Sequence, residues 1–208
     1  MTNILEQYYR QRSRPSEPQR KRLLVVTPPA LEPLSLQQVK KHLEISSSDD
    51  AHDSHLFDLL RTAREQWEHD TDSAIATQQL RLNLCEFPEC IELPTRPIQS
   101  LQSIKYYDSG NVQQTLSSTV YSLDSLSRRV RLRYLEIWPA TVDRWDAIEV
   151  NFTAGYSAPF LVPMVAKQAM LLLIGYYFEN RDMHANEVIY NRTAYESLVA
   201  RFIRSTYP

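Results

Sequence analysis

Glycine is scarce in this chain. Only Gly110, Gly155 and Gly175 occur among 208 residues. Phosphate-binding loops and dinucleotide folds need clustered glycines, because the backbone must approach the ligand closely there. The three isolated glycines therefore argue against an enzyme that cradles a nucleotide.

Cysteines and targeting signals are also few. Cys85 and Cys90 are the two cysteines and form no CxxC pattern, so they predict free thiols in a reducing compartment. The N-terminus lacks the apolar core of a signal peptide. The uninterrupted apolar run Ala169–Phe178 is well short of the roughly 20 residues that a membrane-spanning helix needs. We therefore expect a soluble protein made in the cytosol, with no membrane partner.

Catalytic motifs are absent from the sequence as well. We find no P-loop, EF-hand loop or G-x-S-x-G elbow. The nearest arrangement to a metal site is the pair His52 and His55 beside Asp49, Asp50 and Asp53. Because no second ligand pair follows at zinc spacing, the favoured interpretation is solvated residues at the start of a helix. We expect no enzyme activity, no metal and no cofactor.

The N-terminal 30 residues differ in composition from the rest of the chain. Two prolines, Pro15 and Pro18, stand among basic residues. This composition cannot build a core and predicts either a solvated tail or an arm that lies on a partner. The residues of this basic arm are Arg10, Arg12, Arg14, Arg20, Lys21 and Arg22.

Four helices are expected, over residues 35–44, 53–70, 163–180 and 193–204. Ser35 and Gln38 form a capping box at the start of the first helix. The second helix has an apolar stripe and a charged outer face. The stripe comprises Leu56, Leu59, Leu60, Ala63 and Trp67, and the outer face comprises Arg61, Arg64, Glu65 and Glu68.

The third helix, residues 163–180, is apolar nearly all round. Its first position, Pro163, suits a first helical turn. One face is predicted to carry Val165, Ala169, Leu172 and Tyr176, and much of the opposite side carries Met164, Leu171, Ile174 and Phe178. A helix of this kind must be covered on more than one side, either by a large core or by a neighbouring subunit.

A small antiparallel β unit is expected between the second and third helices, over about residues 78–153. Leu80, Leu82 and Leu84 alternate with polar residues, as in a half-buried strand. The sequence Asp108-Ser109-Gly110-Asn111 is a hairpin-turn signature, which predicts an exposed tip that contacts another protein. The sequence thus predicts an α+β fold of about four helices with an inserted β unit and extended termini.

The last helix, residues 193–204, is short and has one apolar stripe. Tyr195, Leu198, Val199 and Phe202 form the stripe, and Arg201 and Arg204 lie near the C-terminus of the helix. Isolated helices of about a dozen residues are marginal in water. Two alternatives remain open: the helix docks on a partner or a neighbouring subunit, or it folds back on its own domain.

The order of several short blocks resembles the head-to-tail connector (adaptor) proteins of tailed bacteriophages, in particular the subgroup that carries a β insertion within a helical adaptor. The resemblance covers about residues 34–202. Two departures are Thr71-Asp72, where the family commonly has Thr-Gly, and the long basic arm. The blocks are Leu34-Ser35-Leu36 with Val39-Lys40 and Leu43; Asp49-Asp50, Ala63-Arg64 and Trp67-Glu68; Leu93-Pro94, Pro97 and Ser100; Tyr107-Asp108-Ser109-Gly110; Trp138-Pro139 and Asp143; Phe152-Thr153-Ala154-Gly155-Tyr156; and Val162-Pro163, Lys167-Gln168-Ala169 and Tyr177-Phe178-Glu179-Asn180-Arg181.

The resemblance implies a structural virion protein at the head-tail interface, assembled in the host cytoplasm. Such adaptors form a dodecameric ring beneath the portal protein, extend the channel for passing double-stranded DNA without sequence specificity, and receive a stopper or other neck or tail protein. The third helix would then supply subunit contacts, the last helix would dock on the portal or a neighbour, and the Asp108–Asn111 turn would meet the next neck protein.

Two other functions compete with this interpretation. A DNA-binding packaging or head-completion factor would use the basic arm, although a net charge of −2 is unlike that of a general nucleic-acid binder. An enzyme is the other alternative, and the missing nucleophile and metal patterns argue against it.

Overall fold

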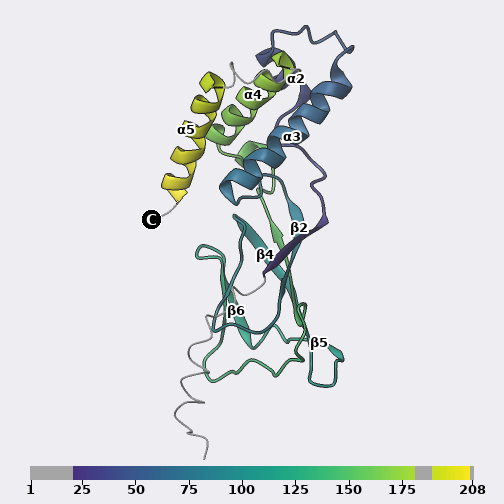
Figure 1. Ribbon diagram of the computed structural model, residues 1–208, viewed down its shortest axis with the longest axis vertical. Helices are drawn as coiled ribbons and strands as arrows, with labels where there is room; N and C mark the ends of the chain where they lie inside the picture. Colours follow the sequence, from purple (N-terminus) through teal and green to yellow (C-terminus); the bar gives the residue numbers. More distant parts are fainter. Residues whose placement is uncertain (1–20, 181–188, 207–208) are drawn as a thin grey trace, which may run out of the picture.

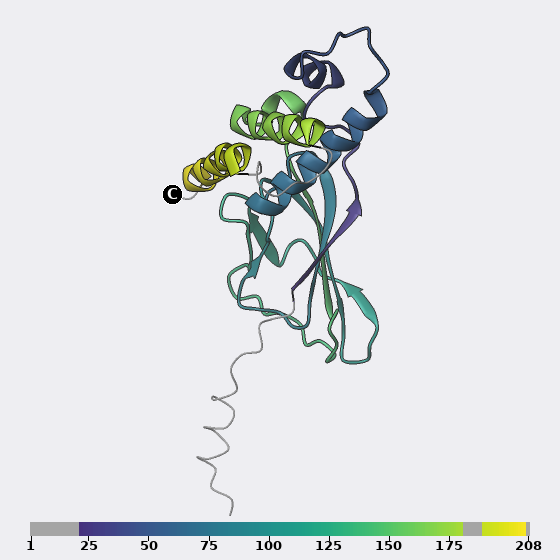
Figure 2. The same ribbon diagram turned by 45° about the horizontal axis from the view of Figure 1, so that its top comes forward.

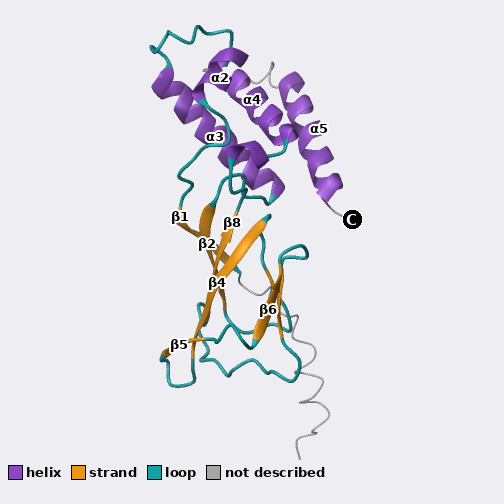
Figure 3. Ribbon diagram, turned by 180° about the vertical axis from the view of Figure 1, so that it is seen from behind, coloured by secondary structure: helices purple, strands orange, loops and turns teal. Residues whose placement is uncertain are grey.

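The computed structural model describes residues 21–180 and 189–206. The molecule is elongated, with the helices gathered at one end and the strands at the other (Figures 1 and 3). The fold is α+β, as the sequence predicts. Among the described residues, no helix is both long and apolar enough to cross a membrane.

The helical part consists of α2, α3, α4 and α5 with a short 3₁₀ turn, η1. These elements span Leu36–His42, Asp53–Thr71, Met164–Glu179, Ile189–Thr206 and Pro159–Leu161, respectively. The α4 helix lies beside both α3 and α5 (Figure 2). Each helix expected from the sequence is present, and the largest difference is that α5 begins four residues earlier than predicted.

The start of α2 follows the local sequence signal. The Ser35 hydroxyl accepts from the Gln38 backbone N–H, and the Gln38 side chain accepts from the Ser35 N–H, so the capping box is formed. The α3 helix ends at Thr71, and the capping residue Asp72 adopts the left-handed conformation with φ of 49°. Aspartate occupies that conformation here without the glycine that the connector family commonly has at this point.

The face of α4 that enters the core differs from the predicted one. The buried residues are Ala166, Ala169, Met170, Leu173 and Ile174. Val165, Leu172 and Tyr176 are only half-buried, so of the predicted stripe only Ala169 is fully buried. Because α4 is apolar on all sides and touches α2, α3 and α5, the spacing of apolar residues does not identify its buried face.

The outer face predicted for α3 is also partly wrong. Arg64 is buried and Glu68 is largely covered. Arg64 Nε donates to Glu32 Oε2 at 2.9 Å, and Arg64 Nη1 donates to Glu68 Oε2 at 2.9 Å. A buried charge is tolerated only when it is paired and hydrogen-bonded, and these carboxylates meet that need for Arg64.

The β part contains two antiparallel sheets. The five-stranded sheet has the order β1-β2-β8-β4-β5, and the three-stranded sheet has the order β3-β7-β6. Inward-facing residues from both sheets form one apolar cluster, which includes Leu82, Phe152, Ile104 and Val130. The strands are β1 (Arg22–Thr27), β2 (Gln78–Leu84), β3 (Ile91–Glu92), β4 (Ile98–Tyr107), β5 (Gln113–Thr115), β6 (Tyr121–Asp124), β7 (Arg129–Leu132) and β8 (Ile148–Ala154).

Strand β1 corrects the expected extent of the basic arm. Residues 22–27 pair with β2, from Arg22 opposite Asn83 to Thr27 opposite Gln79. Arg22 therefore belongs to the sheet. The surrounding arginines and prolines conceal this strand in the sequence, because composition alone indicates a segment without a core.

The two parts of the molecule meet where β8 leaves the sheet. Gly155 has φ of +106°, and a Cβ placed there would lie 2.2 Å from the carbonyl oxygen of Ala76. The Gln99 side chain donates to the Gly155 carbonyl at 2.7 Å and to the Thr77 hydroxyl at 2.8 Å. Only glycine allows this close approach of two backbones, so Gly155 fixes how the sheet joins the helices.

Candidate functional site

The histidines near the start of α3 have structural neighbours. His52 occupies the N-cap position of α3, and its ring lies edge-on to Phe178 with 5.7 Å between centroids. Asp53 pairs with Lys40 at 2.5 Å. Within residues 21–180 and 189–206, no group of three or more His, Cys, Asp or Glu side chains is placed to hold a metal ion.

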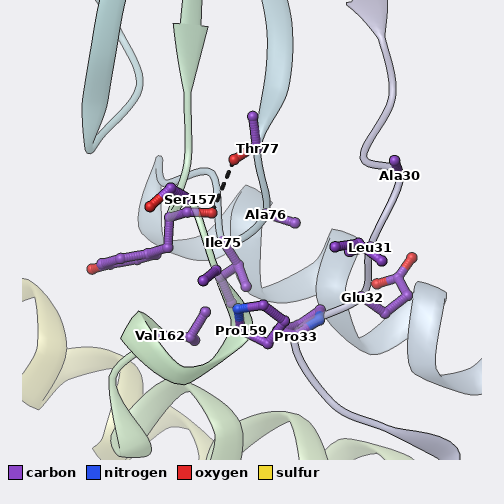
Figure 4. Close-up of a pocket in the computed structure, with 12 residues that line it drawn as sticks. Ala30, Leu31, Glu32, Pro33, Ile75, Ala76, Thr77, Ser157, Pro159 and Val162 are labelled. Atoms are coloured by element: carbon purple, nitrogen blue, oxygen red, sulfur yellow. Dashed lines mark hydrogen bonds between the residues drawn. The ribbon is translucent and has the colours of Figure 1, made fainter.

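A small hollow lies at the junction between the helices and the sheet (Figure 4). Its volume is about 140 Å³, comparable with one large side chain rather than a cofactor. Its lining is mainly apolar and includes Leu31, Ile75, Tyr156 and Val162. The hydroxyl of Thr77, also in the lining, donates to the Tyr156 carbonyl at 3.0 Å. This surface can receive an apolar group but does not gather reactive side chains.

A buried polar network strengthens the same junction. Glu68 accepts from the Ile75 backbone N–H at 2.7 Å and from the Gln78 amide at 3.1 Å, in addition to Arg64. Burial raises the pKa of the Glu68 carboxyl above its ordinary value, although its hydrogen bonds and the charge of Arg64 act in the opposite direction. The network joins α3 to the first residues of β2, so its role is structural.

The turn Asp108–Asn111 lies at the end of the molecule opposite to the helices, between β4 and β5 (Figures 1 and 3). Ser109, Gly110 and Asn111 are exposed, as expected from their sequence. Asp108 Oδ1 accepts from the backbone N–H groups of Gly110 and Val112. These bonds, with the Gln114 amide, hold the pKa of Asp108 below its ordinary value, and the bond from Val112 has the largest effect. The turn is therefore preorganised as well as exposed.

The segment between β7 and β8 reaches the same end of the molecule. Arg144 Nη1 donates to Asn111 Oδ1 at 3.1 Å, and the Arg144 guanidinium lies 3.9 Å from the centroid of the Tyr107 ring. The segment carries Tyr134, Leu135 and Ile137, which are 91%, 85% and 84% exposed. Large apolar side chains this exposed and this close together are typical of an interaction surface. The sequence analysis did not identify this surface, although Tyr134, Leu135 and Ile137 lie within four positions.

Strand β1 is a second exposed apolar feature. It forms one edge of the five-stranded sheet, and Leu23, Val25 and Val26 are 40%, 58% and 49% exposed. Leu23 and Val25 lie opposite Leu82 and Leu80, so they extend the apolar face of the sheet beyond its covered part. Within the described part of the chain, no strand pairs with the outer edge of β1. An apolar edge strand without an internal charge or proline is a template for pairing with another chain.

Helix α5 folds back on its own domain. Tyr195 and Phe202 are buried, and both rings pack against Trp67, with centroid distances of 6.3 and 5.2 Å. The Tyr195 hydroxyl donates to Asp70 Oδ2 at 2.7 Å. Burial, followed by this bond, raises the pKa of Tyr195 far above its ordinary value. The docking role predicted for Tyr195 and Phe202 is therefore corrected, since both belong to the core of their own chain.

Other predicted site residues have more open positions. In α5, Leu198 and Val199 are half-buried and Arg201 is exposed. In α4, Val165, Leu172 and Tyr176 are half-buried. Phe178 is half-buried against His52 and His55. The side chain of Arg204 and the arm residues Arg10, Arg12, Arg14 and Arg20 lie outside the described part of the chain, whereas Lys21 and Arg22 are exposed at the start of β1.

Comparisons with known proteins show a shared fold. A chain from the "neck of empty GTA particle computed with C6 symmetry" matches with a TM-score of 0.72 and 22% identity, covering 87% of this chain and 94% of that one. A chain from the "virion of native gene transfer agent (GTA) particle" matches with a TM-score of 0.69 and 23% identity, covering 86% and 93%. A chain from the "neck of native GTA particle computed with C12 symmetry" matches with a TM-score of 0.67 and 23% identity, covering 87% and 94%. No protein-family model and no curated protein matches the chain.

Proposed function

We propose that this chain is a structural protein of the neck of a phage-like particle, a head-to-tail connector of the adaptor type, without enzyme activity. The observation that carries this proposal is the fold, which extends over 87% of the chain and 94% of a chain from a GTA particle neck. The order of the sequence blocks from Leu34 to Phe202 supports the same function. The connector would be part of the virion at the head-tail interface, after assembly in the host cytoplasm.

The connector is proposed to act as a ring, with twelve copies around the DNA channel. A cyclic ring uses two different surfaces of each subunit, because every contact is heterologous. Strands β2, β4 and β8 run roughly along the long axis of the molecule, and β1 runs obliquely at one edge of their sheet (Figure 1). In such a ring, the edge of β1 would contact a neighbouring subunit. The half-buried side of α4, with Val165, Leu172 and Tyr176, offers a further contact in the helical part.

The two ends of the molecule are proposed to meet different proteins. At the helical end, α5 would face the portal protein or a neighbouring subunit through the exposed Arg201 and the uncovered parts of Leu198 and Val199, which also pack against the core of their own chain. At the opposite end, the Asp108–Asn111 turn and the exposed Tyr134–Ile137 segment would receive the stopper or another neck or tail protein. Arg144, which lies in the same connection between β7 and β8 as Tyr134–Ile137, donates to Asn111, so this connection contacts the turn.

Electron microscopy of the purified chain, with and without portal rings, tests the proposal. The expected result is a ring that stacks on the portal. Val25→Lys places a charge on the open edge of β1 and is expected to prevent ring formation while leaving the monomer folded. Gln37→Lys, at an exposed position of α2, makes the same change of charge away from the edge and serves as the control. A wild-type chain that neither forms rings nor binds portal rings would refute the connector function.

The alternative is a DNA-binding packaging or head-completion factor that acts through the basic arm. It predicts that the free chain retains DNA at low salt and that replacing Arg10, Arg12, Arg14 and Arg20 by glutamine abolishes this retention. Portal binding by the same variant distinguishes the two functions. A connector does not need the arm to bind DNA, so the variant of a connector still binds portal rings.

A further inference from the structure

Basic residues are concentrated in and beside strand β7 of the three-stranded sheet. Four of the eight Lys and Arg residues in the segment 78–154 lie between Arg128 and Arg133. The strand alternates, so that Val130 is fully buried and Leu132 is half-buried, whereas Arg129, Arg131 and Arg133 are exposed. The arginines therefore share the outer face of the sheet, opposite to its apolar core.

The neighbours of these arginines leave part of the positive charge unbalanced. Arg129 pairs with Glu92 at 3.0 Å and lies opposite Asp124 in the strand register. Arg131 lies opposite Ser122. Among the described residues, Arg128, Arg131 and Arg133 have no carboxylate within ion-pairing distance.

Asp124 is a second acidic group beside this face, and it accepts hydrogen bonds from its own turn. The Ser127 hydroxyl donates to Asp124 Oδ2 at 2.6 Å, and the backbone N–H groups of Leu126 and Ser127 donate to Oδ1. These bonds, chiefly those from Ser127, lower the pKa of Asp124, and the charge of Arg131 contributes a smaller effect. Asp124 therefore stays ionised and offsets part of the charge of Arg129 and Arg131, while Arg133 is farther along the strand.

Arg133 is exposed and has one hydrogen bond to the neighbouring strand. Its Nε donates to the Tyr121 carbonyl oxygen at 3.2 Å, and this bond does not use the terminal nitrogens of the guanidinium. Residues two apart on a strand are separated by about 6.8 Å, so Arg131 and Arg133 present two guanidinium groups along one line. Guanidinium groups match the geometry of phosphate oxygens.

We propose that Arg131 and Arg133, here called the arginine stripe, contact the phosphates of double-stranded DNA. The inference rests on the proposed function and would place the outer face of the three-stranded sheet toward the DNA that passes through the ring. Phosphate contacts carry no sequence information. A few such contacts per subunit are weak alone and act together when a ring repeats them. DNA can then be held loosely and still move.

Salt-dependent binding of a 30-base-pair duplex of arbitrary sequence, followed by fluorescence anisotropy, tests the stripe on the full chain. The stripe variant is Arg131→Gln with Arg133→Gln. The control variant is Lys41→Gln with Arg61→Gln, two exposed positions on the helices that remove the same charge. Residues 1–20 remain in every variant, so any contribution of the basic arm is common to all of them.

Each phosphate contact adds about 0.9 to the slope of log K against log salt concentration. The stripe variant is therefore expected to lower the magnitude of the slope by about 2, with weaker binding at low salt, while the control keeps the wild-type slope. Arg131→Lys with Arg133→Lys keeps the charge and is expected to keep the slope. Any of three results would refute phosphate binding by the arginine stripe. These are equal slopes for wild type and stripe variant, equal losses of binding in the stripe and control variants, or no binding of DNA by the wild type at low salt.

Ring formation by the same variants, measured by electron microscopy with portal rings, separates the two proposals. If the stripe variant forms normal rings and binds DNA like the wild type, DNA binding by the arginine stripe is refuted and the connector function is not. Failure of every variant, including wild type, to form rings contradicts the connector function, whatever the DNA measurement shows.

Discussion

Phe202→Ala tests whether α5 belongs to the core of its own chain. The Phe202 ring is 8% exposed, packs edge-on against Trp67 at 5.2 Å, and lies 5.6 Å from the Arg96 guanidinium. Truncation of a buried phenylalanine to alanine costs about 3–5 kcal/mol. Because Phe202 lies near the end of the last helix, where the surroundings can relax, we expect the lower value, about 3 kcal/mol.

The loss can be measured by urea unfolding and by thermal melting. For a chain of this length, 3 kcal/mol corresponds to a fall in melting temperature of roughly 6–12 °C. Trp67 lies directly against the missing ring, so its fluorescence reports on the site, and Trp67→Phe in the same background identifies its share of the signal from the three tryptophans.

Arg201→Ala is the matched control, since Arg201 precedes Phe202 on the same helix and is exposed. Its expected effect is within about 0.5 kcal/mol. A Phe202→Ala chain that melts like wild type, yet no longer binds portal rings, would refute the argument, because it would show that α5 docks on a partner instead of on α3 and α4.

Three further predictions concern the junction and α4. Gly155→Ala should lower the free energy of unfolding by about 2–3 kcal/mol, because its Cβ would lie 2.2 Å from the Ala76 carbonyl oxygen. Gly110→Ala, in the exposed turn, is the control. Equal urea midpoints for the two variants would contradict the close approach at Gly155. The pKa of Glu68 is raised in the folded state, so just above pH 4.5 the folded chain binds more protons than the unfolded chain, and the free energy of unfolding should fall as pH rises through this range. Glu68→Gln should remove this part of the pH dependence of stability. Identical pH profiles of stability for the variant and the wild type would refute the prediction. Leu172→Asp should cost roughly 1 kcal/mol yet prevent ring formation in sedimentation, whereas Leu173→Asp, in the core, should unfold the chain; normal rings from Leu172→Asp would exclude this side of α4 from the subunit contact.

Several elements follow from short-range signals. The capping box of Ser35 and Gln38 and the alternation of Leu80, Leu82 and Leu84 each depend on neighbouring residues, and both are present in the structure. The Asp108–Asn111 turn is exposed for the same reason, since its polar residues and its glycine satisfy the turn locally. Local signals of this kind specify an element wherever it lies in the fold.

Other features depend on partners far along the chain. Arg64 looks like an outer-face residue until Glu32, 32 positions away, and Glu68 enclose it. Strand β1 follows an arginine-rich segment and becomes a strand by pairing with β2, more than 50 positions later. In both cases the residue composition is ambiguous, and a distant partner decides the outcome.

The sequence by itself determined most elements of this protein: the α+β class, the four helices, the strand-forming segments of about residues 78–153 and the scarcity of catalytic motifs. Periodicity and capping are properties of neighbouring residues, so they can be read without knowing the fold. Only the tertiary structure decided which side of α4 is buried, that Tyr195 and Phe202 pack on Trp67, and that β1 is the edge strand of its sheet among the described residues. Apolar side chains favour burial away from water wherever they lie, so the sequence shows which residues need to be covered. Which residues cover them depends on how elements far apart in the sequence pack together.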